Sequence, residues 1–461
     1  MMNLSYFKPV KQTHIIFLTF SVLSGLLYHY SYTSGYIIFI ALIPWIHILR
    51  HANTRHAIAY SLLIGFFWMA SFHYWILGLI HYSSPAGVVF LWLCYSLYQG
   101  LYYGLYIGLI VYKQHRYFIT ITILCVSWPI FELIRPLLPY GSPGGSLGLS
   151  VAYSPELIYL ARWIKLEGIS GLVVLINGLL YIAIIKRKLT VFIIILLLKV
   201  IIMKTDNVEP TLTKRFEQQL VLIDTDYSQS YKLNPLNWQS ILNDMKESIR
   251  KFRQSSPTII IFPETIVPGL VENSYFFKIL KDELINYKET SILFGLPIER
   301  QGKLYNSIVR YDWSGFDNTE YRKQQLIPIG EYLPFRNVMN YFRNSDKIQN
   351  PDYSEGDNNY IKFESKTINF ITAICLEVAY NKRIKKQLNN QRDMILILAN
   401  TAWFEEHGAD DKIRRFGLYR AVENQLPIAI ITNKGHTFIA NKYGKIIQQT
   451  DKKNNVVKVN I

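Results

Sequence analysis

The hydrophobic pattern changes near residue 205. Before this point, apolar runs of bilayer-spanning or nearly bilayer-spanning length follow one another at about 14–31, 36–50, 57–80, 86–112, 117–134, 166–185 and 188–204. The fifth and seventh runs are short or flanked by charge. We therefore expect residues 1–205 to form a polytopic α-helical membrane bundle of about seven helices.

After residue 210 the pattern becomes one of short apolar stretches that alternate with longer amphipathic ones. It predicts strands at 219–224, 258–262, 291–296, 306–311, 368–374, 394–398 and 427–432, and helices at 237–254, 275–286, 381–389 and 412–425. Such alternation is typical of an α/β domain whose sheet is buried between helices. Residues 210–461 are therefore predicted to form a second, water-soluble domain.

The charges agree with this division. The first 204 residues carry three carboxylates, those of Glu132, Glu156 and Glu167, although the whole chain has 33. Lysine and arginine gather in alternate short loops, on the side of the membrane that includes the N-terminus. By the positive-inside rule the N-terminus is cytoplasmic, and an odd number of crossings places residues 210–461 outside the cytoplasm.

The net charge of +16 does not indicate a nucleic-acid partner. Most of the excess lies in the membrane part, where basic residues set topology, and the soluble part is only mildly basic. A weak attraction to anionic membrane lipids explains it better. Of the three cysteines, Cys94 and Cys125 lie in predicted spans. Cys375 therefore has no disulfide partner in its domain, which favours a reactive role.

Three chemically capable side chains lie at strand ends of the predicted sheet. Glu264 follows the strand at 258–262, Cys375 follows the strand at 368–374, and Lys323 precedes the segment Leu326–Glu331. Each alone has a plain explanation, as a helix cap, a buried thiol or a solvated lysine. Together, at the edge where α/β folds place their sites, they supply a base, a nucleophile and a cation.

This constellation resembles the nitrilase superfamily, whose triad is Glu, Lys and Cys in that chain order. The similar segments are Pro263-Glu264, Lys323 with Pro328-x-Gly330-Glu331-Tyr-x-Pro334, Cys375-x-Glu377, Asn400-Thr-Ala-Trp-Phe404, Arg420-Ala-Val-Glu423 and Thr432-Asn-x-Gly435. A nitrilase-like domain after a polytopic bundle is similar to the apolipoprotein N-acyltransferase family in particular. The resemblance implies an α-β-β-α sandwich for residues 210–461.

The residue types assign roles to the triad. The Cys375 thiolate attacks an ester carbonyl, and Glu264 takes its proton. Lys323 stabilises the thiolate and the oxyanion, with the Leu376 backbone N–H as a second donor. The resemblance implies a ping-pong cycle: an acyl chain passes from a membrane phospholipid to Cys375 as a thioester, and then to the α-amine of a diacylglyceryl-cysteine at the N-terminus of an apolipoprotein.

Further expectations accompany this interpretation. Glu331 and Glu377 are candidate supports that hold Lys323 or move protons. No metal ion or cofactor is expected, and the cell (inner) membrane is the expected location, with an extracytoplasmic catalytic domain. Residues 335–342 have an apolar helical face that favours a membrane-dipping arm over packing on the domain. The glycine-rich region 136–165 either shapes a lipid-facing site or is a plain connector, and Glu132 and Arg135 before it are expected to pair.

Two alternatives stay open. A membrane-tethered carbon–nitrogen hydrolase, or amidase, would use the same triad with water in place of the amine. A non-catalytic scaffold would keep the fold alone, and the complete triad argues against it. The sequence departs from the family pattern at Leu376, Leu233, Gly144 and Ile413, where the family has aromatic residues or histidine.

Overall fold

The computed structural model describes residues 10–110, 117–187, 218–328, 330–332, 352–357, 368–388, 392–404, 407–451 and 455–460. The chain divides into two compact units, Met1–Val208 and Glu209–Ile461, and each is described by itself. The predicted span at 188–204 and the apolar segment at 335–342 lie outside the described residues.

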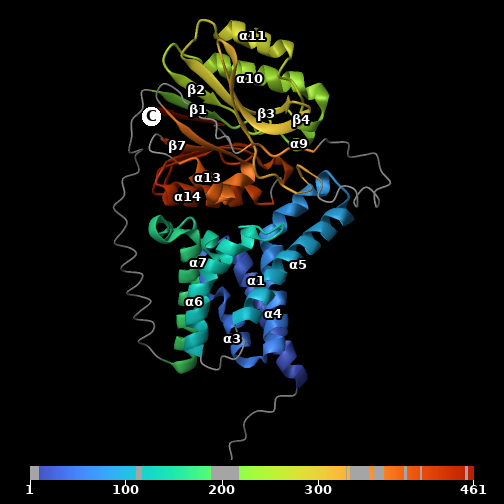
Figure 1. Ribbon diagram of the computed structural model, residues 1–461, viewed down its shortest axis with the longest axis vertical. Coiled ribbons are helices and arrows are strands. Elements are labelled where there is room, and N and C mark those ends of the chain that lie inside the picture. Colours follow the sequence, from blue (N-terminus) through green and yellow to red (C-terminus); the bar gives the residue numbers. More distant parts are fainter. Residues whose placement is uncertain are drawn as a thin grey trace, which may run out of the picture. The chain divides into compact units, whose positions relative to one another are not determined.

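The first unit is built from helices (Figure 1). They are α1 (Val10–Ser31), η1 (Gly35–Ile37), α2 (Ile38–Ala41), α3 (Ile43–His51), α4 (Thr54–Phe72), η2 (His73–His81), α5 (Pro85–Ile110), α6 (Tyr117–Ile134), η3 (Arg135–Leu137), η4 (Leu147–Val151) and α7 (Pro155–Lys186). Among the described residues, three helices are both long and apolar enough to cross a membrane: Thr13–Ser31, Thr54–His81 and Pro155–Lys186. The unit is therefore a helical membrane bundle, and the number of its crossings stays a prediction.

Two predicted spans differ from the observed helices. The run at 36–50 is divided among η1, α2 and α3, because Pro44 lies in the first turn of α3, where its missing N–H is tolerated and a new helix can begin. The sixth predicted span, at 166–185, lies within α7. This helix begins at Pro155 rather than near 166, and its backbone leaves helical geometry at Lys165. Part of the expected connector at 136–165 is therefore helix.

Close contact between α4 and α5 depends on glycine. A Cβ atom at Gly65 would lie 2.8 Å from the Gly100 carbonyl oxygen, and one at Gly100 would lie 2.6 Å from the Phe66 nitrogen. Small residues let two membrane helices approach this closely. The glycines therefore fix the α4–α5 contact.

The buried rings of Trp45 on α3, Trp68 on α4 and Trp128 on α6 pack edge to face. The expected ion pair between Glu132 and Arg135 is absent from the described residues. Glu132 instead accepts hydrogen bonds from Trp128 Nε1 (2.8 Å) and the Leu147 backbone N–H (3.1 Å). Arg135 Nη2 donates to the Gly144 carbonyl oxygen at 2.6 Å. Both charges thus hold the glycine-rich loop against the bundle.

The second unit contains two sheets. Their strands are β1 (Gln219–Ile223), β2 (Thr258–Ile261), β3 (Thr290–Arg300), β4 (Lys303–Asp312), β5 (Gly315–Arg322), β6 (Phe370–Ile374), β7 (Met394–Asn400), β8 (Ile428–Asn433), β9 (Phe438–Ala440), β10 (Ile446–Gln449) and β11 (Val456–Asn460). The first sheet has the order β11-β1-β2-β3-β4-β5 and the second the order β10-β9-β8-β7-β6. The trios β1-β2-β3 and β6-β7-β8 are parallel, with Gln219 opposite Thr258 and Phe370 opposite Met394.

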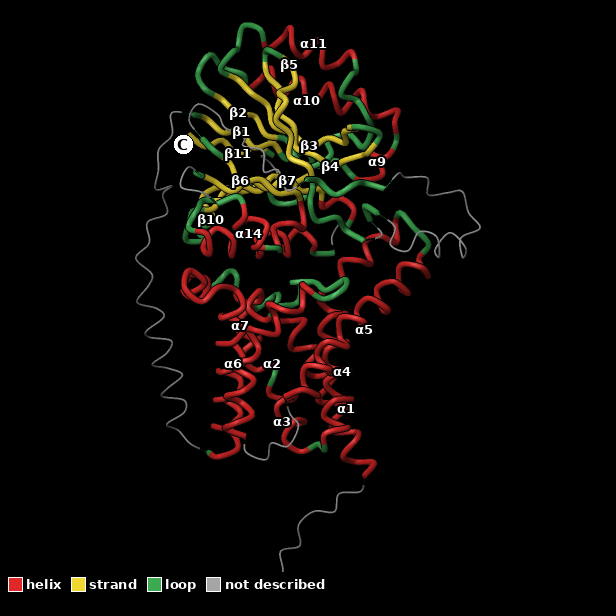
Figure 2. Tube along the Cα trace, viewed as in Figure 1, coloured by secondary structure: helices red, strands yellow, loops and turns green. Residues whose placement is uncertain are grey.

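Helices cover the outer faces of the two stacked sheets (Figure 2). The helices of the second unit are α9 (Gln229–Leu233), η5 (Pro235–Asn237), α10 (Trp238–Phe252), α11 (Tyr275–Leu284), η6 (Cys375–Ala379), α13 (Asn381–Lys386), η7 (Thr401–Trp403) and α14 (Ala409–Asn424). The amphipathic α10 and α11 bury their apolar faces on the first sheet, and α13 and α14 lie on the second (Figure 1). The predicted membrane bundle followed by an α-β-β-α sandwich is confirmed.

Candidate active site

Glu264 lies in the loop after β2, held close against β3. The Gly295 N–H donates to the Pro263 carbonyl oxygen at 3.0 Å, and the Ile266 N–H donates to the Gly295 carbonyl oxygen at 3.0 Å. A Cβ atom at position 295 would lie 2.5 Å from the Glu264 Cα. Only glycine at 295 therefore allows this loop to carry its carboxylate to the end of the sheet.

The buried Glu264 carboxylate is held by three donors. Its Oε1 accepts from Asn306 Nδ2 at 2.8 Å and lies 3.4 Å from Lys323 Nζ. Its Oε2 accepts from the Asn400 backbone N–H at 2.8 Å. A carboxylate bonded at both oxygens has a fixed orientation, which general-base catalysis requires.

Lys323 follows β5 directly, and its backbone N–H donates to the Asn306 carbonyl oxygen at 2.8 Å. Its Nζ lies 2.8 Å from Glu331 Oε1, and the side chain is 1% exposed. Burial by itself lowers the pKa of Lys323, but the negative charges of Glu331 and Glu264 raise it well above its ordinary value. The site therefore holds a permanent ammonium group.

Asn306, on β4, connects the two carboxylates and was not predicted as a site residue. Its Nδ2 donates to Glu264 Oε1 and also to Glu331 Oε1, at 2.8 and 2.9 Å. An asparagine within an apolar strand has no signal of its own in the sequence. Only the pairing of β4 with β5, which sets Asn306 beside Lys323, reveals that it fixes the spacing of Glu264 and Glu331.

Cys375 occupies the sharp turn between β6 and η6. Its φ of 52° lies in the left-handed region, which is strained for a residue other than glycine and is typical of a nucleophile at a strand-to-helix turn. Burial and the charge of Glu264 raise the pKa of the Cys375 thiol, while Lys323 and a hydrogen bond from the Asn400 backbone oppose that shift. The resting thiol is therefore neutral and needs a base to ionise it.

Glu331 and Glu377 support the site in different ways. Glu331 bonds Lys323 directly, and its Oε2 accepts from the Ile327 N–H at 2.9 Å. The fully buried Glu377 accepts from the backbone N–H groups of Gln324, Gln325 and Ile374 and from the Tyr321 hydroxyl, at 2.7–2.9 Å.

The three bonds from Tyr321, Gln324 and Gln325 join the end of β5 and the segment after it to the turn after β6, and the fourth, from Ile374, lies within that turn. Glu377 therefore fixes the Lys323 segment relative to the nucleophile. The structure thus brings Glu264, Lys323 and Cys375 to one buried point and surrounds them with Glu331, Glu377 and the half-buried Leu376. The chemical roles of these residues stay predictions.

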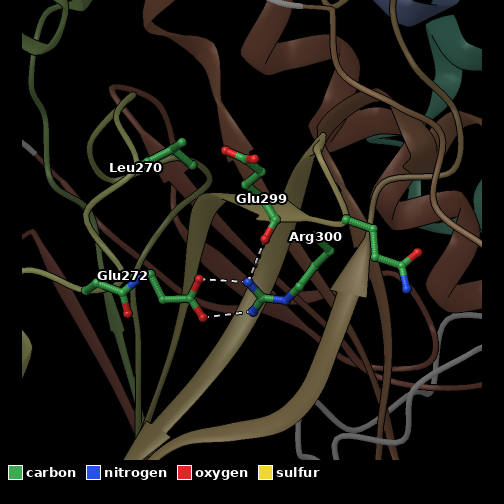
Figure 3. A pocket seen from close by; sticks show the side chains of 6 residues that line it. Leu270, Glu272, Glu299 and Arg300 are labelled. Atoms are coloured by element: carbon green, nitrogen blue, oxygen red, sulfur yellow. Dashed lines mark hydrogen bonds and ion pairs between the residues drawn. The ribbon is translucent and has the colours of Figure 1, made fainter.

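A separate hollow of about 310 Å³ lies elsewhere on the domain and is lined by Leu270, Glu272, Asn273, Glu299, Arg300 and Gln301. Figure 3 shows the guanidinium of Arg300 facing the carboxylate of Glu272, and Arg300 also bonds Glu320. Arg300 and Glu272, two of the charged residues that line it, pair with each other, and none of the predicted site residues lines it. It has no part in the candidate chemistry.

Family models match two parts of the chain. The apolipoprotein N-acyltransferase N-terminal domain matches residues 22–179, and the carbon-nitrogen hydrolase model matches residues 229–461. The predicted resemblance to both families is confirmed.

Individual relatives agree with the family models. An apolipoprotein N-acyltransferase of Photobacterium profundum is 27% identical over 335 residues, which are 70% of this chain and 64% of that protein. One of Wigglesworthia glossinidia brevipalpis is 26% identical over 329 residues, which are 69% of this chain and 64% of that protein. The chain thus spans 64% of the length of each of these curated relatives. The solved structure of Saccharomyces cerevisiae Nit3, a member of branch 10 of the nitrilase superfamily, has 14% sequence identity and a TM-score of 0.40, and the match covers 54% of this chain and 92% of that one.

Proposed function

Because the chain belongs to the carbon–nitrogen hydrolase family, we propose that it is an N-acyltransferase that moves an acyl chain from a membrane phospholipid to the α-amine of a diacylglyceryl-cysteine in an apolipoprotein. The observation that carries the proposal is the conjunction of two features in one chain. A buried Glu264–Lys323–Cys375 constellation is preceded by a helical membrane unit that matches the N-terminal domain of apolipoprotein N-acyltransferases. Both substrates of such a reaction reside in a bilayer.

The first half-reaction loads the enzyme. Glu264 takes the proton from the Cys375 thiol as sulfur attacks the ester carbonyl of the phospholipid. Lys323 stabilises the developing oxyanion, with the Leu376 N–H as a second donor. The carbon–oxygen bond then breaks, and Glu264 returns the proton to the leaving lysophospholipid hydroxyl. An acyl thioester on Cys375 remains.

In the second half-reaction the acceptor amine attacks the thioester. Glu264 removes a proton from the attacking nitrogen, the carbon–sulfur bond breaks, and the thiolate receives that proton. Glu331 and Glu377 hold Lys323 and the Cys375 turn in fixed positions relative to each other. We further propose that residues 1–205 are the membrane part and residues 210–461 the extracytoplasmic catalytic domain, with the N-terminus in the cytoplasm of an inner-membrane, multi-pass protein.

The purified full chain should convert phospholipid and a diacylglyceryl-cysteine peptide into N-acylated peptide and lysophospholipid, with little free fatty acid. The thioester survives until the amine arrives because its surroundings exclude water. The measurement is mass spectrometry of the peptide together with lipid analysis. A matched peptide with an acetylated N-terminus is the control and should remain unchanged. Hydrolysis of small amides with the free peptide amine left untouched would instead favour the amidase alternative.

Asn306→Ala should lower turnover by about 10- to 100-fold, because loss of the donor that spaces Glu264 and Glu331 misplaces the base by a fraction of an ångström or more. The matched control is Ser307→Ala. Ser307 is the next residue on β4, and its buried hydroxyl has no hydrogen-bond partner among the described residues. Steady-state turnover of the two variants would decide the matter, and equal activity of both would show that Asn306 has no positioning role.

A further inference from the structure

A second buried lysine lies at the same end of the domain as Glu264. Lys232, in α9, is 1% exposed, and its Nζ has no hydrogen-bond partner within the part of the chain that the structure describes. Burial of an ammonium group without a partner costs free energy. Such a group therefore loses its proton easily or binds a partner from outside the protein. Nothing in the two half-reactions above uses Lys232.

Hydrogen bonds fix α9 to the catalytic centre. Gln229 Oε1, one helical turn before Lys232, accepts from Asn400 Nδ2 at 3.0 Å. The backbone N–H of the same Asn400 holds Glu264 Oε2 at 2.8 Å. The Lys232 carbonyl oxygen accepts from Trp238 Nε1 at 2.8 Å, which anchors the end of the helix. Lys232 is therefore held beside Glu264 by contacts that its own Nζ does not make.

Burial makes the Lys232 ammonium group easier to deprotonate than an ordinary lysine. Burial lowers the pKa of Lys232 to about 7, although the negative charge of Glu264, which faces it from the loop after β2, acts to raise it. The negative charge of Glu264 is balanced by the ammonium group of Lys323, and Glu264 also faces the Cys375 thiol. On its own helix, Lys232 is preceded by the uncharged Tyr231. Near pH 7 an appreciable fraction of the side chain is thus an amine that can accept a proton.

The two half-reactions differ in their proton balance. Acylation of Cys375 consumes an ester and a thiol and yields a thioester and an alcohol, with no net proton. The acceptor, however, arrives as an ammonium ion, because an α-amine has a pKa of about 7.7–8.0. It must lose two protons to become an amide. Glu264 carries one of them to the Cys375 thiolate, and the other has no acceptor in the triad.

We propose that Lys232 is the base that takes this first proton. The acceptor ammonium transfers a proton to the neutral Lys232 amine, and the free amine attacks the Cys375 thioester. Glu264 then moves the second proton from nitrogen to the leaving sulfur, and the Lys232 ammonium releases its proton to solvent after the product leaves. The inference rests on the proposed function. It adds the residue that prepares an ammonium acceptor for attack, a step that water as an acceptor does not need.

The test separates the two half-reactions. Full-length protein is loaded from palmitoyl phospholipid in detergent micelles, and the burst of lysophospholipid counts the folded, acylated sites. A diacylglyceryl-cysteine peptide is then added, and transfer per loaded site is followed between pH 6 and 9.5. Lys232→Met should load at the normal rate but transfer about tenfold more slowly near pH 7. Its rate should recover as the acceptor amine loses its own proton above pH 8.

Lys232→Arg, a permanent cation, should show the same transfer defect. The matched control is Lys412→Met. Lys412 is a partly buried lysine of α14 whose pKa burial also lowers, to about 8, and it lies beside Asp411 rather than Glu264. That variant should keep the normal transfer profile. An unchanged pH profile for Lys232→Met, or equal slowing of loading and transfer, would overturn the assignment. Failure of the unaltered protein to load at all would overturn the proposed function itself.

Discussion

Cys375→Ala is expected to lower acyl transfer by roughly ten-thousand-fold or more and to leave the protein folded in the membrane. In the proposed mechanism the sulfur of this residue forms the thioester, and residues 209–461 contain no other cysteine. Alanine keeps the buried turn filled except for one atom, so the core of the sandwich loses little. The measurement is N-acylation of a diacylglyceryl-cysteine peptide by purified protein.

Cys94→Ala provides the matched control, because Cys94 lies exposed on α5 and takes no part in the candidate site. It should keep normal turnover. Thermal unfolding and detergent gel filtration of both variants show whether folding is retained. Turnover close to normal in a folded Cys375→Ala protein would remove Cys375 as the nucleophile.

Glu264→Gln is the second change with a large expected effect, a loss of about a hundred- to ten-thousand-fold in turnover. Glutamine is nearly the same size, so the Gly295-dependent loop stays in place. It cannot accept the thiol proton, and its amide group would meet donors from Asn306 or Asn400 where the carboxylate accepts. The neutral Cys375 thiol would then have no base.

The pH profile of this variant distinguishes loss of a base from loss of a group that acts only by position. Glu264 contributes to the raised pKa of Cys375, so its removal lowers that pKa and allows hydroxide to form the thiolate directly. The residual rate should therefore rise by about tenfold per pH unit below the new pKa. Steady-state rates between pH 6 and 10 check this. A flat residual profile would mean that Glu264 acts only by position.

The secondary structure of the soluble unit was largely predictable, because its buried strands are continuous apolar runs. The strand predicted at 394–398 is β7 (Met394–Asn400), and the helix predicted at 275–286 is α11 (Tyr275–Leu284). By contrast, β5 (Gly315–Arg322) was not predicted. It lies at the edge of the first sheet and reads Gly-Phe-Asp-Asn-Thr-Glu-Tyr-Arg, so no hydrophobic pattern identifies it. Its pairing with β4 is nevertheless what delivers Lys323 to the site.

The candidate triad and its supports Glu331 and Glu377 could be named from the sequence, and their chemical roles stay predictions. Glu264 and Cys375 each follow an apolar strand, so their positions at strand ends could be inferred from the sequence, although β2 and β6 belong to different sheets. Asn306 and Lys232 could not be identified in this way, because no motif marks them. Only the tertiary hydrogen bonds of Asn306 and the burial of Lys232 show that they lie at the site. Glu377 is predicted to hold Lys323 or to move protons, and this role stays a prediction. Its bonds reach the backbone of Gln324 and Gln325, directly after Lys323, which depends on how the two sheets face each other.

The central claim is that the acyl chain passes through Cys375. It is tested most directly by incubating the purified full chain with phospholipid in the absence of acceptor and mapping the modified peptide by mass spectrometry. The account predicts a single acyl group on Cys375, released by hydroxylamine as a thioester is, and lost with formation of N-acylated product when the diacylglyceryl-cysteine peptide is added. Product formation with an unmodified Cys375, or with the acyl group on another residue, would contradict it.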